Sequence, residues 1–450
     1  MTTNATTHHR DDKSLKRILG LPSLVFFGLA YMVPLTVFTT YGVVTQETAG
    51  HLPTAYIVTL AAMFFTAYSY GRMVEAFPAA GSAYTYTRRA FGGRAGFMVG
   101  WTLLLDYIFL PMINYLVIGI YMKEYFPAVP EAVWIVGAIA LVTALNILGI
   151  RLVAKMNFLI IAFQIVFLVV FIAISLSALG SADAPSLLSP FYSQELAFPA
   201  ILAGAAILCL SFLGFDAVST LSEETREPTR DIPRAIMLCT LIGGAIYIVT
   251  SWAGHIIFPD WQNFGNADSA AVDVMQRAGG IFMVTFFTAA YVAGCFASAM
   301  ASQASVSRIL YAMGRDNVLP RSVFGKVSRR YATPVGATLV VGAISLLALV
   351  ISLSLAATMI SFGALVAFSF VNLSVIKHFL VDERQRSGSD LLRYGLLPSI
   401  GFLLTVWLWT SLSATTFEVG LTWFAVGFVY LLYLTRLFKR EVPDFDLQEA

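Results

Sequence analysis

The sequence carries little charge for its length. Of its 450 residues only 12% are Asp, Glu, Lys or Arg, whereas 58% are hydrophobic, and the mean hydropathy is +0.78. A soluble globular domain typically has about 25% charged residues, which it needs to cover its surface. This composition excludes a soluble protein of the same size, so we expect an integral membrane protein.

Cysteine is scarce, and the short motifs of several enzyme classes are missing. The three cysteines, Cys209, Cys239 and Cys295, lie in apolar runs without CxxC spacing, which excludes a disulfide framework and a zinc site. The chain has no HExxH, no GxSxG and no phosphate-binding GxxxxGK[ST] loop. We therefore expect no metal, no cofactor and no enzyme activity. Without a nucleotide site, any transport must be secondary.

Long apolar runs recur along the chain, and at ~20 residues per crossing they predict about twelve spans. The runs are apolar on every face, which indicates helices and not the alternating strands of a barrel. The expected fold is an all-α integral membrane protein with twelve transmembrane helices in residues 18–436, between tails at 1–17 and 437–450. The spans are centred near Tyr31, Met63, Leu110, Ile139, Phe167, Leu210, Tyr247, Ala290, Val341, Ala364, Leu404 and Phe428.

The basic residues predict the orientation. All Lys and Arg residues except Lys123 and Arg277 fall in the tails or in alternate loops, and positive residues in short loops are retained on the cytoplasmic side. Both termini are therefore expected in the cytoplasm, with the chain in the inner (plasma) membrane and the lipid bilayer as its partner. Residues 1–17 are polar, which predicts no cleavable signal. The charges do not form one patch, which argues against nucleic-acid binding.

Two spans are interrupted by residues that break helices. The first contains Gly28 and Pro34, and the sixth contains Gly214 within 211–216. Two interrupted helices five spans apart are typical of an inverted repeat with a substrate site near the midplane. The spacing predicts a first repeat over 18–180, a second over 198–380 and two extra helices over 394–436.

Three acidic residues lie well inside the predicted spans: Glu75, Asp106 and Asp216. A carboxylate at the centre of a spanning helix costs ~2.5–3.5 kcal/mol on insertion scales, so it usually faces a cavity, a partner charge or a cation. Glu75 lies three positions after Arg72, which favours an interfacial ion pair. Asp106 leaves two interpretations open, a substrate ligand or a carboxylate satisfied by neighbouring hydroxyls. Asp216 lies inside the second interruption, which favours a binding site.

Three cytoplasmic segments carry a family resemblance. They read PAAGSAYTY at 78–86, EETREPTRDIPRAI at 223–236 and SRILYAMGRDNVLP at 307–320. Together they resemble the amino acid–polyamine–organocation (APC) superfamily of transporters. Within it the chain is most similar to the bacterial putrescine importers, through GLAY at 28–31, GFMVGW at 96–101, LDYIFLPMIN at 105–114 and FLGFDA at 212–217.

The resemblance implies a LeuT-like transporter with a five-plus-five inverted repeat, broken helices one and six, two extra helices and alternating access. It also implies a cationic metabolite as substrate. Two positions depart from the family pattern. Thr39 stands where the importers carry an acidic residue, and Gln164 stands where many proton-coupled relatives carry a lysine.

Two carboxylates facing one cavity suit a substrate with two ammonium groups, because each can form charge-assisted hydrogen bonds. We expect import of putrescine or a similar diamine, with Asp216 as the main ammonium ligand and Asp106 as the second. Neighbouring rings would cover the methylenes and add cation–π attraction of ~0.5–2 kcal/mol each, with ordinary packing as the alternative. The other expected substrate-binding residues are Tyr31, Tyr107, Phe212, Phe215, Gly214 and Asn114.

The coupling ion and the substrate class leave alternatives open. Two nearby carboxylates without a cation should share a proton, which favours proton symport. Sodium held by Ser302 and Ser305 is an alternative, although small hydroxyls also serve helix packing. The main rival function is an amino acid permease of the same superfamily, because broken helices also bind a zwitterion. A two-aspartate membrane protease and a receptor or scaffold are disfavoured, and the sequence predicts no oligomeric state.

Overall fold

The computed structural model describes residues 17–179, 186–193, 196–265, 267, 270–328, 330–351, 353–410, 412 and 414–438. Most of the two predicted tails, 1–16 and 439–450, lies outside the described residues. Across the described ranges the chain is helical, with no strand beyond an isolated bridge between Leu19 and Thr225. The prediction of an all-α membrane protein is confirmed.

The helices of the first half are α1 (Leu21–Met32), η1 (Pro34–Phe38), α2 (Tyr41–Glu47), α3 (Leu52–Ala76), α4 (Ser82–Phe91), α5 (Gly93–Tyr125), α6 (Glu131–Leu148) and α7 (Ile150–Ala178). The second half begins with α8 (Phe198–Leu208), η2 (Cys209–Phe212), η3 (Asp216–Glu224), α9 (Pro228–Ile257), η4 (Trp261–Asn263) and α10 (Ala270–Arg315). It continues with α11 (Val335–Ser345), η6 (Leu346–Leu349), α12 (Leu353–Val375), η7 (Ile376–Asp382), α13 (Gly388–Asp390), η8 (Leu391–Leu396), α14 (Leu397–Trp409) and α15 (Ala414–Leu434).

The described part of the chain contains 11 helices that are long and apolar enough to cross a membrane. Every predicted span centre falls in a helix, but the ninth lies in the shorter apolar segment Val335–Leu349. This segment, α11 with η6, is shorter than the ~20 residues of a perpendicular crossing. The count of twelve spans therefore remains a prediction.

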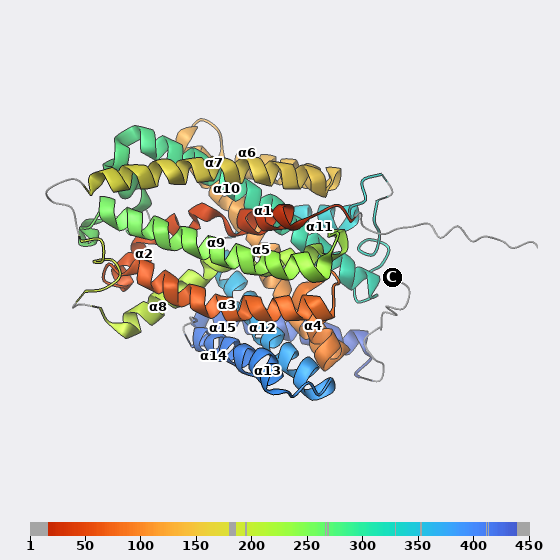
Figure 1. Ribbon diagram of the computed structural model, residues 1–450. Coiled ribbons are helices and arrows are strands. Elements are labelled where there is room, and N and C mark those ends of the chain that lie inside the picture. The colour runs from red at the N-terminus through yellow and green to blue at the C-terminus, as the bar shows by residue number, and fades with distance from the viewer. Residues whose placement is uncertain are drawn as a thin grey trace, which may run out of the picture.

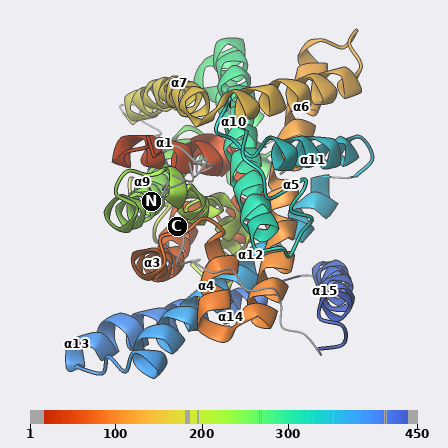
Figure 2. The ribbon, with the colours of Figure 1, turned by 90° about the vertical axis from the view of Figure 1, so that its right-hand side faces the viewer.

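The helices form one bundle with a central and a peripheral layer. Helices α1, α9 and α3 lie side by side across one face (Figure 1). In the end view α5, α10 and α12 lie near the middle, while α14 and α15 lie outside them (Figure 2). The buried share of the apolar stretch is 78% in α5 and 17% in α15, so α5 belongs to the core and α15 to the lipid-facing surface.

Both predicted helix interruptions are present in the backbone. Helix α1 ends at Met32, and Val33 has φ 51°, after which the chain continues as the short η1. In the second interruption Leu213 is extended and Gly214 has φ 122°, before η3 begins at Asp216. Each interruption leaves carbonyl and N–H groups without their helical partners at the centre of the bundle.

Candidate functional site

The two helix interruptions lie against each other. A Cβ atom at Gly214 would meet the ring of Tyr31, the last aromatic residue of α1. Because Gly214 also has φ 122°, a conformation that L side chains rarely adopt, glycine is required here twice over. Tyr31 therefore closes over the interrupted segment of the other half.

A tyrosine of α9 joins the two interruptions. The Tyr247 hydroxyl lies 3.0 Å from the carbonyl oxygen of Met32 and 2.8 Å from that of Ser211. These carbonyls belong to the two interrupted segments, and the single hydroxyl proton can be donated to either. Tyr247 thus replaces part of the hydrogen bonding that the helix breaks removed.

We expect Tyr247→Phe to weaken substrate binding by about 5- to 150-fold, because leaving a buried carbonyl unsatisfied costs about 1–3 kcal/mol. Initial uptake rates in proteoliposomes, measured against substrate concentration, check this. The matched control is Tyr430→Phe, which removes a peripheral bond of 3.2 Å to the Val318 carbonyl. Equal affinities in both variants would contradict a role for Tyr247 in the site.

Asp216 is held at the start of η3, and its side chain is 1% exposed. One carboxylate oxygen accepts a hydrogen bond of 2.6 Å from the Tyr107 hydroxyl. The other accepts a bond of 3.3 Å from the Gly214 N–H. The carboxylate is therefore positioned by a neighbouring helix and by the interruption itself.

Asp106 lies on α5 beside Tyr107 and is also 1% exposed. Its Oδ1 atom is buried and has no hydrogen-bond partner among the described residues. Asp106 lies close enough to Asp216 for their charges to interact. Within the described ranges, no Lys or Arg forms an ion pair with either carboxylate. Two buried carboxylates without a permanent cation form a site that favours a cationic ligand.

The predicted aromatic residues divide into two groups. Tyr31 and Tyr107 lie beside the carboxylates, with ring centroids 6.3 Å apart. Phe215 stacks on Phe368 of α12 at 5.4 Å, and Phe212 packs edge-on against the Tyr247 ring at 5.4 Å. Tyr107 is therefore bonded to a carboxylate, while Phe212 and Phe215 contact rings of α9 and α12.

Asn114 has a supporting position behind the site. Its side-chain amide donates to the Ser298 hydroxyl at 3.0 Å, and Ser298 in turn donates to the carbonyl oxygen of Tyr31 at 2.8 Å. Asn114 therefore reaches the interruption of α1 through Ser298 of α10. It has no hydrogen bond to either carboxylate among the described contacts.

Several residues of this region were missed from the sequence. Tyr247 bridges the interruptions, Ser298 supports Tyr31, and Tyr70 of α3 packs edge-on against Phe215 at 5.9 Å. The Tyr70 hydroxyl is buried. With 19 tyrosines and 35 phenylalanines in the chain, no sequence signal distinguishes these positions.

The two departures from the family pattern lie near the first interruption. Thr39 follows η1, and its hydroxyl lies 2.7 Å from that of Tyr291 on α10. Gln164 of α7 is fully buried, and both of its amide atoms lack partners among the described residues. A Cβ at Gly294 would contact both Gln164 and Val33, so this amide lies beside the interrupted segment.

A cleft of about 560 Å³, lined mainly by apolar residues, lies between α8, α12 and α14. Its wall includes Leu213, next to the interruption, and Phe368, which stacks on Phe215. Glu47 of α2 supplies a carboxylate to the same cleft. Helices α2 and α8 mark one end of the bundle at the left of Figure 1. The cleft therefore reaches the aromatic layer that adjoins the carboxylates.

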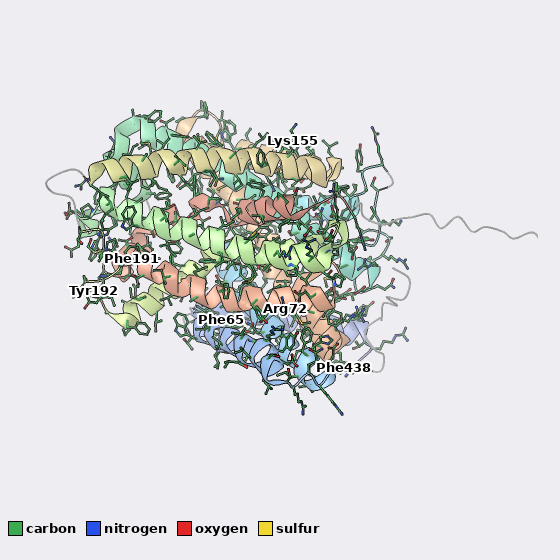
Figure 3. The ribbon with its side chains drawn as sticks, in the orientation of Figure 1. Phe65, Arg72, Lys155, Phe191, Tyr192 and Phe438 are labelled. Atoms are coloured by element: carbon green, nitrogen blue, oxygen red, sulfur yellow. The ribbon has the colours of Figure 1, made fainter. Side chains whose placement is uncertain are left out.

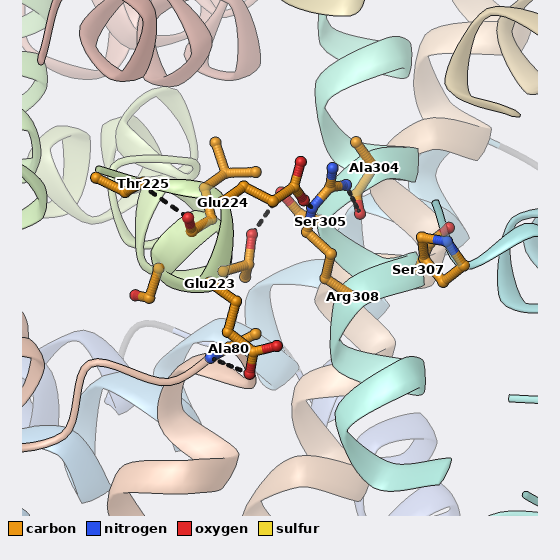
Figure 4. A network of polar contacts seen from close by, with 12 residues as sticks. Ala80, Glu223, Glu224, Thr225, Ala304, Ser305, Ser307 and Arg308 are labelled. Carbon is orange, nitrogen blue, oxygen red and sulfur yellow. Dashed lines mark hydrogen bonds and ion pairs between the residues drawn. The ribbon is translucent and has the colours of Figure 1, made fainter. Parts of the chain in front are cut away.

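The opposite end of the bundle is closed by ion pairs. Arg308 of α10 pairs with Glu224 at the end of η3, and both side chains are at most 4% exposed. Arg315 pairs with Glu223 at 2.8 Å, and the Glu223 carboxylate also accepts a bond from the Ala80 N–H (Figure 4).

The same closure includes α4 and the segment before α1. The Arg88 guanidinium lies 2.6 Å from the Asp316 carboxylate, which also accepts a bond of 2.6 Å from the Tyr84 hydroxyl. The N–H groups of Ile18 and Leu19 donate to the Glu224 carbonyl at 2.9 and 3.0 Å. The three segments that carried the family resemblance thus meet at one place.

The model of the amino acid permease family matches residues 23–437. The chain belongs to this family. It is 41% identical over 437 residues to the low-affinity putrescine importer PlaP of Escherichia coli, covering 96% of each chain. It is 27% identical over 452 residues to the branched-chain amino acid permease BcaP of Bacillus subtilis, covering 94% of each chain. These relatives confirm the superfamily resemblance, and the protein is a membrane transporter and not an enzyme.

Proposed function

We propose that the transporter imports a small diamine, with putrescine as the first substrate to test. The observation that carries the proposal is the pair of buried carboxylates, Asp106 and Asp216, at a helix interruption and without a permanent cation among the described residues. The similarity to a protein named a putrescine importer points the same way.

In this proposal one ammonium group binds Asp216, and the second binds the free Oδ1 atom of Asp106. Hydrogen bonds between charged groups are worth about 1.5–3 kcal/mol each, more than neutral ones. In the same proposal Tyr31 and Tyr107, whose ring centroids lie 6.3 Å apart, cover the apolar methylenes. Pro111 lacks an N–H group, so the Tyr107 carbonyl loses its helical partner and is available to a ligand.

The proposed transport cycle is alternating access in a twelve-helix, LeuT-like architecture. The repeats are 18–180 and 198–380, with extra helices in 394–436 and both termini in the cytoplasm. The cleft beside α8 supplies the outer approach, and the ion pairs of Glu223 and Glu224 close the cytoplasmic end. Opening that end requires these pairs to separate.

The route toward the cytoplasm is proposed to follow buried hydroxyls. Four buried hydroxyls lie there in two neighbouring pairs, Tyr70 with Ser82 and Tyr86 with Ser219, without ideal hydrogen-bond geometry. The rings of Tyr70 and Tyr86 lie 6.1 Å apart, which connects the central site to α4. A hydroxyl both donates and accepts, so each of these pairs can also bond water when water reaches it. They therefore support a hydrated path when the inner end opens.

Proton symport is proposed as the coupling mechanism. Symport requires the proton to travel with the diamine, so one of the two neighbouring carboxylates is protonated in the loaded site, where it accepts a hydrogen bond from an ammonium group through its carbonyl oxygen; it releases the proton to the cytoplasm after the diamine leaves and water enters. Gln164 does not titrate, which leaves the carboxylates as the proton carriers. The membrane potential adds ~4.6 kcal/mol per 100 mV for a dication, twice the value for a single charge.

Proteoliposome counterflow with a panel of amines and amino acids tests the proposal. We expect putrescine to exchange fastest, and an inward pH gradient at zero potential to drive its accumulation. Exchange of neutral branched-chain amino acids without exchange of diamines would contradict the assignment of a diamine as the substrate. That outcome would favour the permease alternative, which the similarity to BcaP supports. Accumulation that depends on potential and not on pH would overturn proton coupling alone.

A further inference from the structure

A second pocket, separate from the carboxylate site, lies at the arginine-rich end of the bundle. It has a volume of about 640 Å³ and is formed by α1, α3 and α9. These helices are neighbours on one face of the bundle (Figure 1), and Arg72 lies on α3 toward this end (Figure 3). The pocket therefore opens on the outer face of the protein.

Positive charge dominates the lining. Arg72, Arg230 and Arg234 contribute three positive charges against the single carboxylate of Glu75, which leaves a net charge of +2. Arg72 and Glu75 pair at 2.6 Å, as the sequence spacing predicted. The Nε atom of Arg72 is nevertheless buried and has no acceptor among the described residues. The Arg72 guanidinium, whose NH2 group is engaged by Glu75, therefore adds positive charge to the pocket wall.

The other two arginines are available to an anion. Arg230 pairs with Glu227 at 3.0 Å, but both side chains are about 60% exposed, and such surface pairs are weak. Arg234 forms no ion pair in the described part of the structure. The first turn of α9, which includes Thr229, has no side-chain cap. Arg230 and Asp231 donate their N–H groups to the Glu227 carbonyl and Pro228 has none, so the N–H of Thr229 is the donor that this turn leaves for a ligand.

One side of the pocket is apolar, and this side continues along the surface of α9. Leu21 and Met237 line the pocket together with Leu238, which lies one helical turn after Arg234. Leu238, Leu241 and Ile242 are 38%, 43% and 37% exposed and continue the same face of the helix. An outward-facing apolar stripe on a spanning helix contacts acyl chains, so Arg234 lies at the level of the lipid headgroups.

We propose that this pocket binds the phosphate of an anionic phospholipid in the cytoplasmic leaflet, with phosphatidylglycerol as the ligand to test. The phosphate contacts Arg230, Arg234 and Thr229, and an acyl chain follows Leu238 toward Ile242. Basic pockets between helices on the cytoplasmic side are suited to such headgroups. The bound lipid also contacts Leu21, so it joins the start of α1 to α9.

Native mass spectrometry of the full-length transporter, loaded with phosphatidylglycerol or phosphatidylethanolamine of matched chains, tests this inference. The wild type should retain phosphatidylglycerol preferentially. Each of Arg230→Gln and Arg234→Gln should weaken its retention about fivefold, and the double variant about 25-fold. The control is Arg330→Gln, an exposed arginine elsewhere on the same side, which should not change retention.

Competition with inorganic phosphate and with glycerol 3-phosphate separates a lipid from a free anion. We expect neither at millimolar concentration to displace the lipid, because the apolar stripe contributes to binding. Displacement would assign the pocket to a soluble phosphate and contradict the proposal that it binds a lipid. Equal retention of phosphatidylglycerol by the wild type and the double variant would contradict the proposal that the lipid binds in this pocket. The variants leave the central carboxylates unchanged. Thermal unfolding in lipid-free detergent checks that each variant folds as the wild type does.

Discussion

Replacing Asp216 by asparagine is expected to reduce the affinity for putrescine by about 30-fold or more. Removing one partner of a buried, hydrogen-bonded charge pair costs about 2–5 kcal/mol. The asparagine retains the size of the side chain, and its amide oxygen can still accept a bond from Tyr107 or Gly214, so the helix interruption should persist. Radiolabelled uptake at low substrate concentration measures the effect.

Glu75→Gln is the matched control for this substitution. Glu75 is also an acidic residue of a spanning helix, but it pairs with Arg72 at the pocket of α3 and α9. We expect putrescine uptake by Glu75→Gln to remain within about twofold of the wild type, because exposed ion pairs contribute little. Unimpaired uptake by Asp216→Asn, with both variants reconstituted in equal amounts, would remove Asp216 from the site.

Glu224→Gln is expected to lower the stability of the closed cytoplasmic end by about 3–5 kcal/mol, because it leaves Arg308 buried without a counter-charge. The substitution Ser305→Cys reports the opening. Ser305 is buried, and its hydroxyl accepts a bond from Thr220 at 3.2 Å. Reaction of the introduced cysteine with an impermeant maleimide from the cytoplasmic side should accelerate at least about 100-fold. The background requires alanine at the three native cysteines.

A second substitution separates gating from misfolding. Glu224→Gln combined with Arg308→Met removes both charges, so most of the lost stability should return. Arg277→Gln, which breaks an exposed pair with Asp260 at 3.4 Å, is the control and should leave the labelling rate unchanged. If Glu224→Gln labels no faster than the wild type, the buried pair does not hold this end closed.

The backbone interruptions followed directly from the sequence. Pro34 and Gly214 impose local conformations that no packing partner has to supply, so both breaks could be placed to within a few residues. Asp106 and Asp216 were found in the same way, because a charge inside an apolar run is conspicuous on its own. The ion pair of Arg72 and Glu75 followed from helical spacing.

The contacts between helices could not be predicted. Tyr247 reaches both interruptions only because α9 packs between α1 and α3, and nothing in its own segment indicates this. Phe212 and Phe215 stay predictions as substrate contacts, and their packing on Tyr247 and Phe368 could not be foreseen from the sequence. Asn114 also stays a prediction, and its hydrogen bond to Ser298 could not be foreseen either. Sequence proximity to a break does not fix the direction of a side chain.

The same limit applies to the cytoplasmic ion pairs. Glu223, Glu224, Arg308 and Arg315 stand in two motifs that the sequence analysis recognised only as family signatures. Their pairing joins residues more than eighty positions apart and depends on how η3 meets α10. The structure thereby gives these motifs a physical role as the closed end of the transporter.

The most direct test compares the binding of putrescine and butylamine, which differ by one ammonium group, to purified wild type and Asp106→Asn. Calorimetry should show that the wild type prefers putrescine by about 10- to 150-fold, the value of one charge-assisted hydrogen bond. In Asp106→Asn the two amines should bind within about threefold of each other. An unchanged preference for putrescine in the variant would contradict the claim that the two buried carboxylates bind the two ends of a diamine.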